Sequence, residues 1–361
     1  MKLLAAAAGL VMILVILWDA FETMVLPRRV ARRLRFTSVY FTIVGEVWWV
    51  VANRIRRPRR REQYLSIFGP LSLILLVITW AWGLVVGFAV LQWGLGSPFT
   101  TPEGAAGFGT DLYVSGTTFF TLGLGDVIPK TALARAVIVV ETGTGFMFLA
   151  LIIGYLPVVY QAFSRREMLI STLDGWAGSP PSAGALLARL GRWGDRAAVE
   201  AFLAQWEHWA AELLESHISY PILAGFRSQH DNQSWLAGLT TILDTCALVL
   251  VGVDGMPQRT AWLTFAMARH AAVDLCQVLN TPPFPPGHDR LPSVDLARLR
   301  ELLATTGISL RAGEDADARL EELRRLYEPY VNALSDETLL PLPAWLPDPQ
   351  ARDNWQKTKW D

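Results

Sequence analysis

Apolar runs along the first 165 residues predict three membrane-spanning helices. A helix takes about 20 apolar residues to cross a bilayer. Residues 3–18 and 65–95 carry no charged side chain, and residues 131–160 carry only Arg135 and Glu141. The first run is followed by Trp18-Asp19-Ala20-Phe21, not by the small residues of a signal-peptide cleavage site. We therefore expect it to remain as an amino-terminal membrane helix.

A fourth stretch, 36–53, is apolar but contains Glu46. Arginines crowd both of its ends, five within 28–35 and six within 54–61. If the stretch crossed the membrane, one arginine cluster would face outside, against the positive-inside tendency. The pattern favours an interfacial helix whose arginines meet lipid phosphates, and a second membrane helix is the alternative. Residues 1–64 form one amino-terminal region in either case.

The stretch between the second and third predicted spans carries the most specific pattern. Residues 112–120 are long enough for about two helical turns, and Thr-Leu-Gly-Leu-Gly-Asp follows at 121–126. Glycines at alternate positions, Gly123 and Gly125, let the backbone adopt conformations closed to other residues. Consecutive carbonyls can then point toward one axis, where oxygens from four chains replace the hydration shell of a potassium ion. A short helix whose carboxyl end faces that axis adds a favourable partial negative charge.

With these residues, the chain from about 65 to 160 resembles the potassium-channel pore family, whose filter usually reads Thr-Val/Ile-Gly-Tyr/Phe-Gly-Asp. The resemblance implies an outer helix at 65–95, a pore helix at 112–120, a filter at 121–126 and an inner helix at 131–160. It also implies roles for the matching residues. The filter consists of Thr121, Leu122, Gly123, Leu124 and Gly125, and K⁺ is coordinated by the carbonyls of Thr121, Leu122, Gly123 and Leu124. Asp126 lies at the outer mouth, Tyr113 supports the filter, and Pro129 and Arg135 are further matches.

Two residues depart from the family pattern. Leu124 stands where Tyr or Phe usually braces the filter, and Phe120 stands where a second threonine is common. The carbonyl of Leu124 is unaffected, and Gly-Leu-Gly is similar to a variant filter of some two-pore-domain potassium channels. A weakly selective cation channel is therefore the alternative to a potassium channel.

The resemblance also implies an assembly and a topology. One pore loop per chain cannot enclose a pore, so four copies are required, as a homotetramer in the lipid bilayer. The family's outer mouth faces outside, which places the arginines of 54–61 and the Arg165-Arg166 pair on the cytoplasmic side, where the positive-inside tendency independently places them. We expect a multi-pass protein of the cell (inner) membrane with a cytoplasmic carboxyl-terminal part. We expect no cofactor besides the permeant K⁺ and no nucleic-acid partner.

The predicted inner helix holds three residues with alternative roles. Gly145 lies near the family's gating hinge, but glycines also serve close helix packing. Pro157 should kink the helix near its cytoplasmic end, where a gate could form. Glu141 is an acid within the span, where acids are expensive. It either attracts cations near the cavity, bonds behind the filter or lies near the outer water.

The remainder of the chain reads as helices separated by Gly, Pro and Ser clusters. Predicted helices are 183–193, 195–219, 235–253, 258–279, 293–305 and 316–335. We expect an all-helical cytoplasmic domain over 165–340 and a tail over 341–361. The stretch 235–253 is nearly apolar enough for a membrane, but Asp244 within it favours a buried bundle helix.

Candidate chemistry in this remainder is sparse. The pairs His208/Glu212 and His270/Asp274 are spaced by four residues, which suits local hydrogen bonds and leaves a metal- or proton-sensing role open. Two cysteines thirty residues apart, Cys246 and Cys276, predict buried reduced thiols. No Gly-x-Gly-x-x-Gly follows a strand, so a nucleotide-sensing domain is not expected. No motif supports an enzyme, and an unknown cytoplasmic ligand stays open.

Composition agrees with this division. The chain is 52% hydrophobic and 18% charged, which excludes disorder and a coiled coil. Lys and Arg number 12 against 4 Asp and Glu in residues 1–64, 2 against 4 in 65–160, and 18 against 25 in 161–361. The sequence thus predicts an all-α membrane protein: a two-helix pore-loop module, an extra amino-terminal helix and a helical cytoplasmic domain. Its function is passive K⁺ conduction, and a membrane-tethered sensor or scaffold with a non-conducting pore is the rival.

Overall fold

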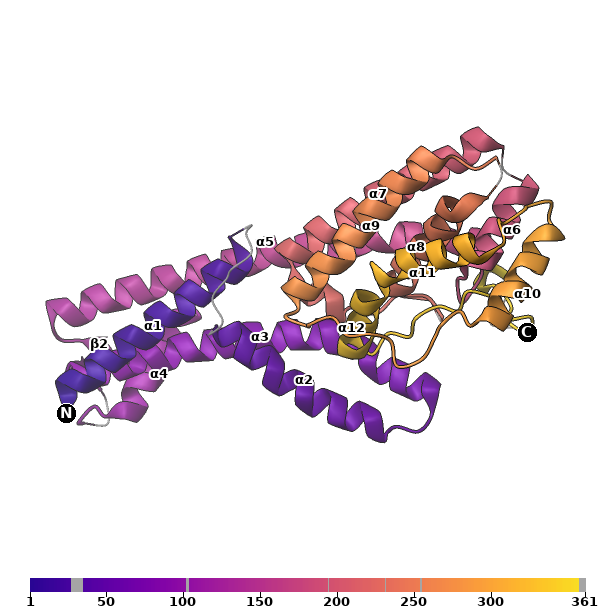
Figure 1. Cartoon of the computed structure of the whole chain (residues 1–361). Coiled ribbons are helices and arrows are strands. Elements are labelled where there is room, and N and C mark those ends of the chain that lie inside the picture. Colours follow the sequence, from indigo (N-terminus) through magenta and orange to yellow (C-terminus); the bar gives the residue numbers. More distant parts are fainter. Residues whose placement is uncertain (27–34, 102–103, 194, 231, 254, 357–361) are drawn as a thin grey trace. The chain divides into compact units, whose positions relative to one another are not determined.

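A computed structural model describes residues 1–26, 35–101, 104–193, 195–230, 232–253 and 255–356 (Figure 1). The arginines within 28–33, which we expected to meet lipid phosphates, lie outside the described residues. The chain forms two compact units, Met1–Tyr160 and Gln161–Asp361. The first holds α1 (Lys2–Met24), α2 (Phe36–Arg54), α3 (Pro58–Gly94), β1 (Phe99–Thr100), α4 (Phe108–Phe119), β2 (Ile128–Pro129) and the first part of α5 (Ala132–Ala177). The second holds the end of α5, α6 (Ala183–Trp193), α7 (Arg196–Ser219), η1 (Pro221–Gly225), α8 (Trp235–Gly252), α9 (Gln258–Val278), α10 (Ser293–Ala304), α11 (Glu314–Arg325), α12 (Glu328–Thr338) and η2 (Asn354–Gln356).

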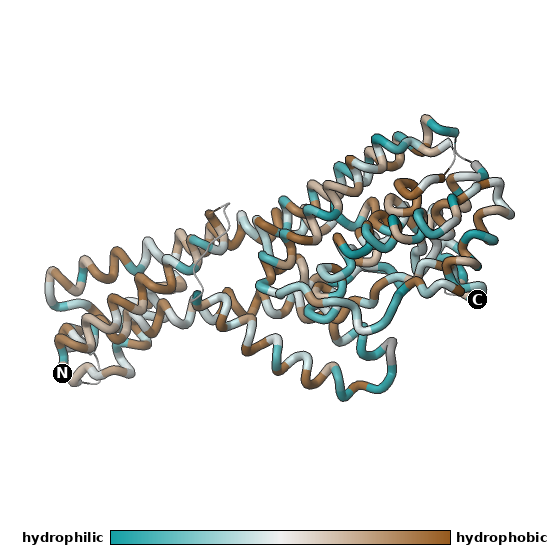
Figure 2. Tube along the Cα trace, in the orientation of Figure 1, coloured by the Kyte–Doolittle hydropathy of each residue, from teal (hydrophilic) through white to brown (hydrophobic). Residues whose placement is uncertain are grey.

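Four of the described helices are long and apolar enough to cross a membrane. They are α1, α3 over Arg60–Gly94, α5 and α8, and α2 is not among them. In Figure 2, α1 and the neighbouring length of α3 are predominantly hydrophobic. The helical content and these spans confirm the predicted all-α membrane class.

Close backbone contact holds α1 and α3 together as antiparallel neighbours. A Cβ added to Gly9 would lie 2.6 Å from the Leu91 nitrogen, and one added to Gly94 would lie 2.3 Å from the nitrogen of Ala6. Residues early in α1 therefore meet residues late in α3. Apolar helices gain little from hydrophobic burial inside lipid, so small residues that admit close van der Waals packing stabilise such pairs.

The carboxylate of Asp19 fixes the other end of α1. It accepts hydrogen bonds from the indole Nε1 of Trp80, at 3.0 Å, and from the backbone nitrogen of Thr37, at 3.2 Å. Thr37 lies in the first turn of α2, where free backbone N–H groups favour a carboxylate. Asp19 is buried. One acidic side chain thus joins α1 to both following helices.

From that point, α2 packs antiparallel along the first part of α3. The rings of Trp48 and Tyr64 stack with centroids 4.3 Å apart, and the hydroxyl of Tyr40 donates to the Ser72 carbonyl at 3.0 Å. This packing uses helical residues before Leu65, where the outer helix was predicted to start. The helix begins at Pro58 because proline suits the first turn and the arginines after it are good helix formers.

In the second unit, α8 is the central helix. Within its apolar window, 89% of the residues are buried. Its Asp244 accepts from Arg290 Nη2 at 2.7 Å and from the hydroxyl of Tyr327, and Arg290 also lies 3.3 Å from Glu328. A buried carboxylate with these partners belongs inside a folded bundle rather than in lipid. The helix therefore has the buried bundle position that its sequence favoured.

One predicted helix in the second unit is wrong. The helix expected over 316–335 is two helices, because Pro329 lacks an N–H and starts α12 instead of continuing α11. The described part of the predicted tail, residues 341–356, contacts other parts of the unit. Trp345 is buried, its carbonyl accepts from Gly184 at 2.9 Å, and the carboxylate of Asp174 accepts from the backbone nitrogen of Trp355 at 3.0 Å.

The end of α5 joins this unit through Arg166, which is buried. Its guanidinium donates to the carbonyls of Leu223 and Phe226 at 2.8 Å and forms an ion pair with Glu167 at 3.0 Å. Its Nη1 also lies 3.3 Å from Nε2 of His217. Because a guanidinium only donates, Nε2 must accept and Nδ1 carries the proton, facing the Leu213 carbonyl at 2.8 Å. The contact thus requires a neutral imidazole.

The close contact of Gly9 with α3 predicts that alanine lowers the thermal stability at this position but not at Gly45. Gly9→Ala should lower the thermal midpoint of the detergent-solubilised full-length protein, because overpacking costs about 1–3 kcal/mol. Gly45→Ala on α2 is the matched control, since an added Cβ there meets nothing within 4 Å. Alanine should leave that midpoint unchanged or raise it, because it favours helix. Equal midpoints for the two variants would contradict the α1–α3 packing.

His217 predicts acid sensitivity in the second unit. Burial, with Arg166 beside it, lowers the pKa of His217 to about 3. Below pH 6.5 the unfolded chain binds a proton that the folded chain refuses, so stability present at pH 7 is lost as pH falls toward 3. The loss should reach about 2 kcal/mol at pH 5.

Amide hydrogen exchange of α7 in the full-length protein, at pH 7 and pH 5 and corrected for intrinsic rates, measures this loss. His217→Gln should remove the pH dependence, whereas His208→Gln should keep it because His208 is exposed. The same pH dependence in the His217 variant as in the natural protein would assign the effect to other groups.

Candidate ion-conducting loop

The residues expected to form a filter follow directly on α4. This helix begins at Phe108, four residues before the predicted pore helix, and ends at Phe119. Its free carbonyls are used by the loop: the nitrogen of Leu122 donates to the Thr117 carbonyl at 2.7 Å, and the nitrogen of Thr121 donates to the Thr118 carbonyl at 3.0 Å. The last turn of α4 therefore determines where the loop begins.

The loop backbone has an alternating conformation. Thr121, Gly123 and Gly125 have φ of 58°, 56° and 76°, in the left-handed region, and neither Leu122 nor Leu124 has a positive φ. Alternation between the two hands turns successive peptide groups toward the same side. The two glycines adopt this region without steric cost, whereas Thr121 pays for it. An added Cβ meets nothing within 4 Å at either glycine, so conformation rather than space explains them.

All six residues of 121–126 are exposed in the single chain. The side chains of Leu122 and Leu124 are each 63% exposed. Large apolar side chains that are this exposed, next to an apolar helix, are unusual on the surface of a protein that acts as a monomer. Several side chains on α5 share this property: Val139, Val140, Phe146, Met147, Leu149 and Ile153.

The expected filter support and outer mouth meet in one hydrogen bond. The hydroxyl of Tyr113, on α4, donates to Oδ2 of Asp126 at 2.9 Å. The bond closes the loop across its length, from the helix before it to the residue that ends it. Leu124 has no aromatic ring to brace the loop, but the hydrogen bond between Tyr113 and Asp126 is another brace.

Short contacts fix the loop on its far side. β1 and β2 pair antiparallel, with Phe99 opposite Pro129, and the nitrogen of Lys130 donates to the Pro98 carbonyl at 2.8 Å. Arg135 Nε donates to the Pro129 carbonyl at 3.4 Å. The chain leaving the loop is therefore tied to the segment that precedes α4.

Gly145 packs directly on the end of α4. An added Cβ would lie 2.1 Å from the carbonyl oxygen of Phe119. One turn further, the ring of Phe148 lies 6.0 Å from that of Phe119 and 6.5 Å from that of Trp80. Packing accounts for this glycine, and a hinge at Gly145 stays a prediction.

Pro157 lies within α5, which continues past the predicted end at residue 160 to Ala177. The extension is helical because α5 packs into the core of the second unit through Ile170 and Leu173. A gate at Pro157 stays a prediction.

Glu141 lies behind the loop, on the face of α5 that meets α4. It is buried, and one carboxyl oxygen forms a hydrogen bond with the hydroxyl of Ser115 on α4. That hydroxyl also lies 2.7 Å from the Val85 carbonyl on α3. Of the three positions open to Glu141, the structure places it behind the filter segment. Ser115 was not predicted from the sequence. The available signal was the four-residue spacing of Glu141 and Gly145, which places both residues on one face of the helix.

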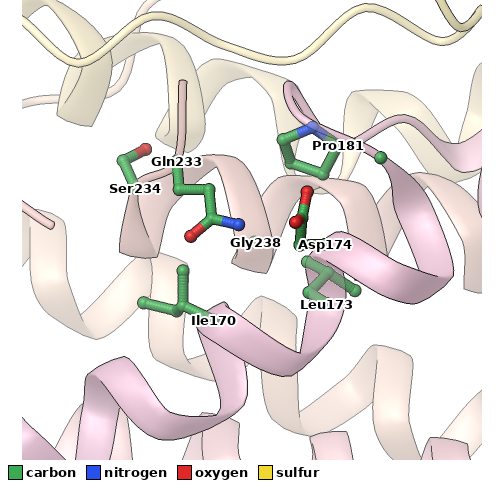
Figure 3. A pocket seen from close by; sticks show the side chains of 8 residues that line it. Ile170, Leu173, Asp174, Pro181, Gln233, Ser234 and Gly238 are labelled. Atoms are coloured by element: carbon green, nitrogen blue, oxygen red, sulfur yellow. The ribbon is translucent and has the colours of Figure 1, made fainter. Parts of the chain in front are cut away.

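The second unit has no comparable site in the residues that the structure describes. A small cavity beside Asp174 and Gln233 (Figure 3) holds no room for a water molecule. No group of three or more His, Cys, Asp or Glu could hold a metal ion among the described residues. His270 pairs with Asp274 at 3.6 Å, and both Cys246 and Cys276 are buried free thiols. Burial raises the pKa of Cys276 to about 12, which keeps it protonated.

Comparison with known proteins places the pore segment in a class. Residues 74–162 match a family model described as an ion channel. They cover the end of α3, the loop and the membrane part of α5. This match supports a pore-loop ion channel family for the segment, and the chain is an all-α membrane protein. The predicted resemblance is thereby confirmed at the level of the family.

The chain is also similar to a bacterial membrane protein. The chain is 23% identical over 243 residues to the uncharacterized membrane protein YdjJ of Bacillus subtilis (strain 168), an alignment that covers 66% of this chain and 69% of the relative. No solved structure matches the chain significantly.

The contact of Gly145 with α4 predicts a position-specific loss. Gly145→Ala should destabilise the full-length protein by about 1–3 kcal/mol, because the added methyl group overlaps a backbone oxygen that cannot move freely. Gly143→Ala, two residues away, is the control, since an added Cβ there meets nothing within 4 Å. Thermal unfolding measures both variants. A Gly145 variant as stable as the Gly143 variant would disprove the packing.

Proposed function

We propose that four copies of this chain form a passive potassium channel. The observation that carries the proposal is the left-handed backbone at Thr121, Gly123 and Gly125, in a loop that ends a helix inside a pore-loop module. The carbonyls of Thr121, Leu122, Gly123 and Leu124 coordinate dehydrated K⁺, which moves by repulsion between neighbouring ions. The protein acts without chemical catalysis.

The assembly follows from exposure and from the ion's needs. One chain offers one side of a coordination shell, and a cyclic arrangement of four closes it. Such an arrangement also covers the exposed apolar residues of the loop and of α5, such as Leu122 and Val139. The lipid bilayer and three further copies are thus the proposed partners.

The topology follows from the direction of the helices. Successive membrane crossings alternate in direction, and α1 and α3 are antiparallel neighbours. A complete crossing by α2 between them would make α1 and α3 parallel. We therefore assign α2 to the cytoplasmic interface of the cell membrane and the amino terminus to the outside. The second unit is then cytoplasmic, on the side of the arginines at 54–61.

A weakly selective cation pore is a second candidate, favoured by one observation. Leu124 is 63% exposed, and it stands where an aromatic ring braces related filters. A less braced filter discriminates less between K⁺ and Na⁺ if selectivity depends on its rigidity.

Ion flux through the purified full-length protein in liposomes, with K⁺ and Na⁺ gradients in competition, tests the function. We expect K⁺ flux that Gly123→Ala abolishes, because alanine is strained at this φ. Gly109→Ala in α4 is the control: it is not in the left-handed region and an added Cβ has open space.

The other outcomes have defined meanings. Equal K⁺ and Na⁺ flux that still depends on Gly123 would move the assignment to the weakly selective pore. No flux at any membrane voltage, from protein that remains assembled, would contradict conduction and favour a membrane-tethered sensor or scaffold.

A further inference from the structure

Three helices meet at the hydroxyl of Ser115, behind the proposed filter. On one side lies the Val85 carbonyl of α3, 2.7 Å away, and on the other lies Oε1 of Glu141 on α5. Ser115, Val85 and Glu141 are all buried. The contact is where the pore helix is attached to the helices on both sides of it.

The number of protons at this contact determines the ionisation of Glu141. A serine hydroxyl has one proton to donate, and a carbonyl can only accept. The proton of Ser115 therefore goes to the Val85 carbonyl. The second short contact, between Ser115 and Glu141, then has no proton unless the carboxyl group supplies it. A neutral carboxylic acid donates one, and an ionised carboxylate cannot.

The surroundings agree with a neutral acid. The second carboxyl oxygen, Oε2, is buried and has no hydrogen-bond partner among the described residues. The ion pairs found in the described part of the chain do not include Glu141. A buried charge without a counter-charge is strongly unfavourable, whereas a neutral acid with one good hydrogen bond is tolerated.

We propose that Glu141 is a positioning residue for the filter: as a neutral acid, it donates a hydrogen bond to Ser115 and so attaches α5 to the pore helix. Gly145, one turn along the same face of α5, brings the helix against Phe119. The polar contact at Ser115 and the close contact at Phe119 together hold both ends of the last turn of α4. Loss of the proton would place two acceptors against each other and release that side of the pore helix.

The charged and titratable groups around this contact are few. On α4, Asp111 lies one turn before Ser115; it is buried and accepts from the hydroxyl of Ser97 at 2.6 Å. On α5, Arg135 faces the Pro129 carbonyl, away from the contact. On α3, the described partner is a backbone carbonyl, which does not titrate.

Infrared difference spectroscopy of the full-length protein in lipid tests the protonation directly. At pH 7, the spectrum of the natural protein minus that of Glu141→Gln should contain the C=O stretch of a protonated carboxyl group. The difference isolates Glu141 from Asp111, which both proteins retain. Glu46→Gln is the matched control, because Glu46 is an exposed acid on α2 and its difference should show carboxylate bands only. Carboxylate bands from Glu141 at pH 7 would overturn the proposal.

Flux against pH tests the consequence. The inference rests on the proposed channel only here, since the infrared result does not require conduction. Above the pH at which half of the Glu141 side chains are ionised, the neutral population falls about tenfold per pH unit, and K⁺ flux should fall with it. Glu141→Gln keeps an N–H donor for Ser115, so it should conduct at neutral pH and lose this alkaline decline.

A second variant protects the test against misfolding. Ser115→Ala removes the acceptor without changing charge, and it should shift the infrared band of Glu141 while lowering flux at every pH. Flux in the natural protein that Glu141→Gln abolishes at all pH values would overturn the proposal. Absence of flux in the natural protein itself would refute the channel and leave the infrared test of Glu141 valid.

Discussion

A backbone that leaves helical geometry inside a bilayer must still find a partner for every peptide group, and this constraint governs the pore module. The loop after α4 meets it in two directions. Its first N–H groups donate to the carbonyl oxygens of Thr117 and Thr118, at the end of the helix. Its own carbonyls, turned by the alternating backbone, accept from no backbone donor among the described residues. In the proposed channel, permeant cations are the partners of these carbonyls, and this need connects the fold to the proposed function.

The rest of the unit keeps that loop in place. Tyr113 on α4 donates a hydrogen bond to Asp126 at the end of the loop, and β1 and β2 tie its exit to the segment that precedes α4. Gly145 and Glu141 attach α5 to the two ends of the last turn of α4. These contacts are local and redundant. A filter without the usual aromatic residue therefore still has braces, which is relevant to the role of Leu124.

Sequence predicted the elements better than their contacts. Apolar runs gave the membrane helices, because long uncharged stretches have few alternatives in a folded chain. The boundaries moved where polar helix formers extended α3 backward to Pro58, and where Pro329 divided one expected helix. In the loop, glycine spacing indicated the backbone conformation. The contact of Gly145 with Phe119 and the donor state of Glu141 depend on how three helices meet, and no pattern within one helix specifies that.

The central claim is that four copies place the carbonyls of Thr121 to Leu124 around one axis and that K⁺ occupies the space between them. An electron cryomicroscopy map of the full-length protein in lipid and K⁺ measures this most directly. The map should show four copies around the axis, with the carbonyls of the loop facing it and a line of ion density along it. A different number of copies, or a loop whose carbonyls face away from the axis, would contradict it.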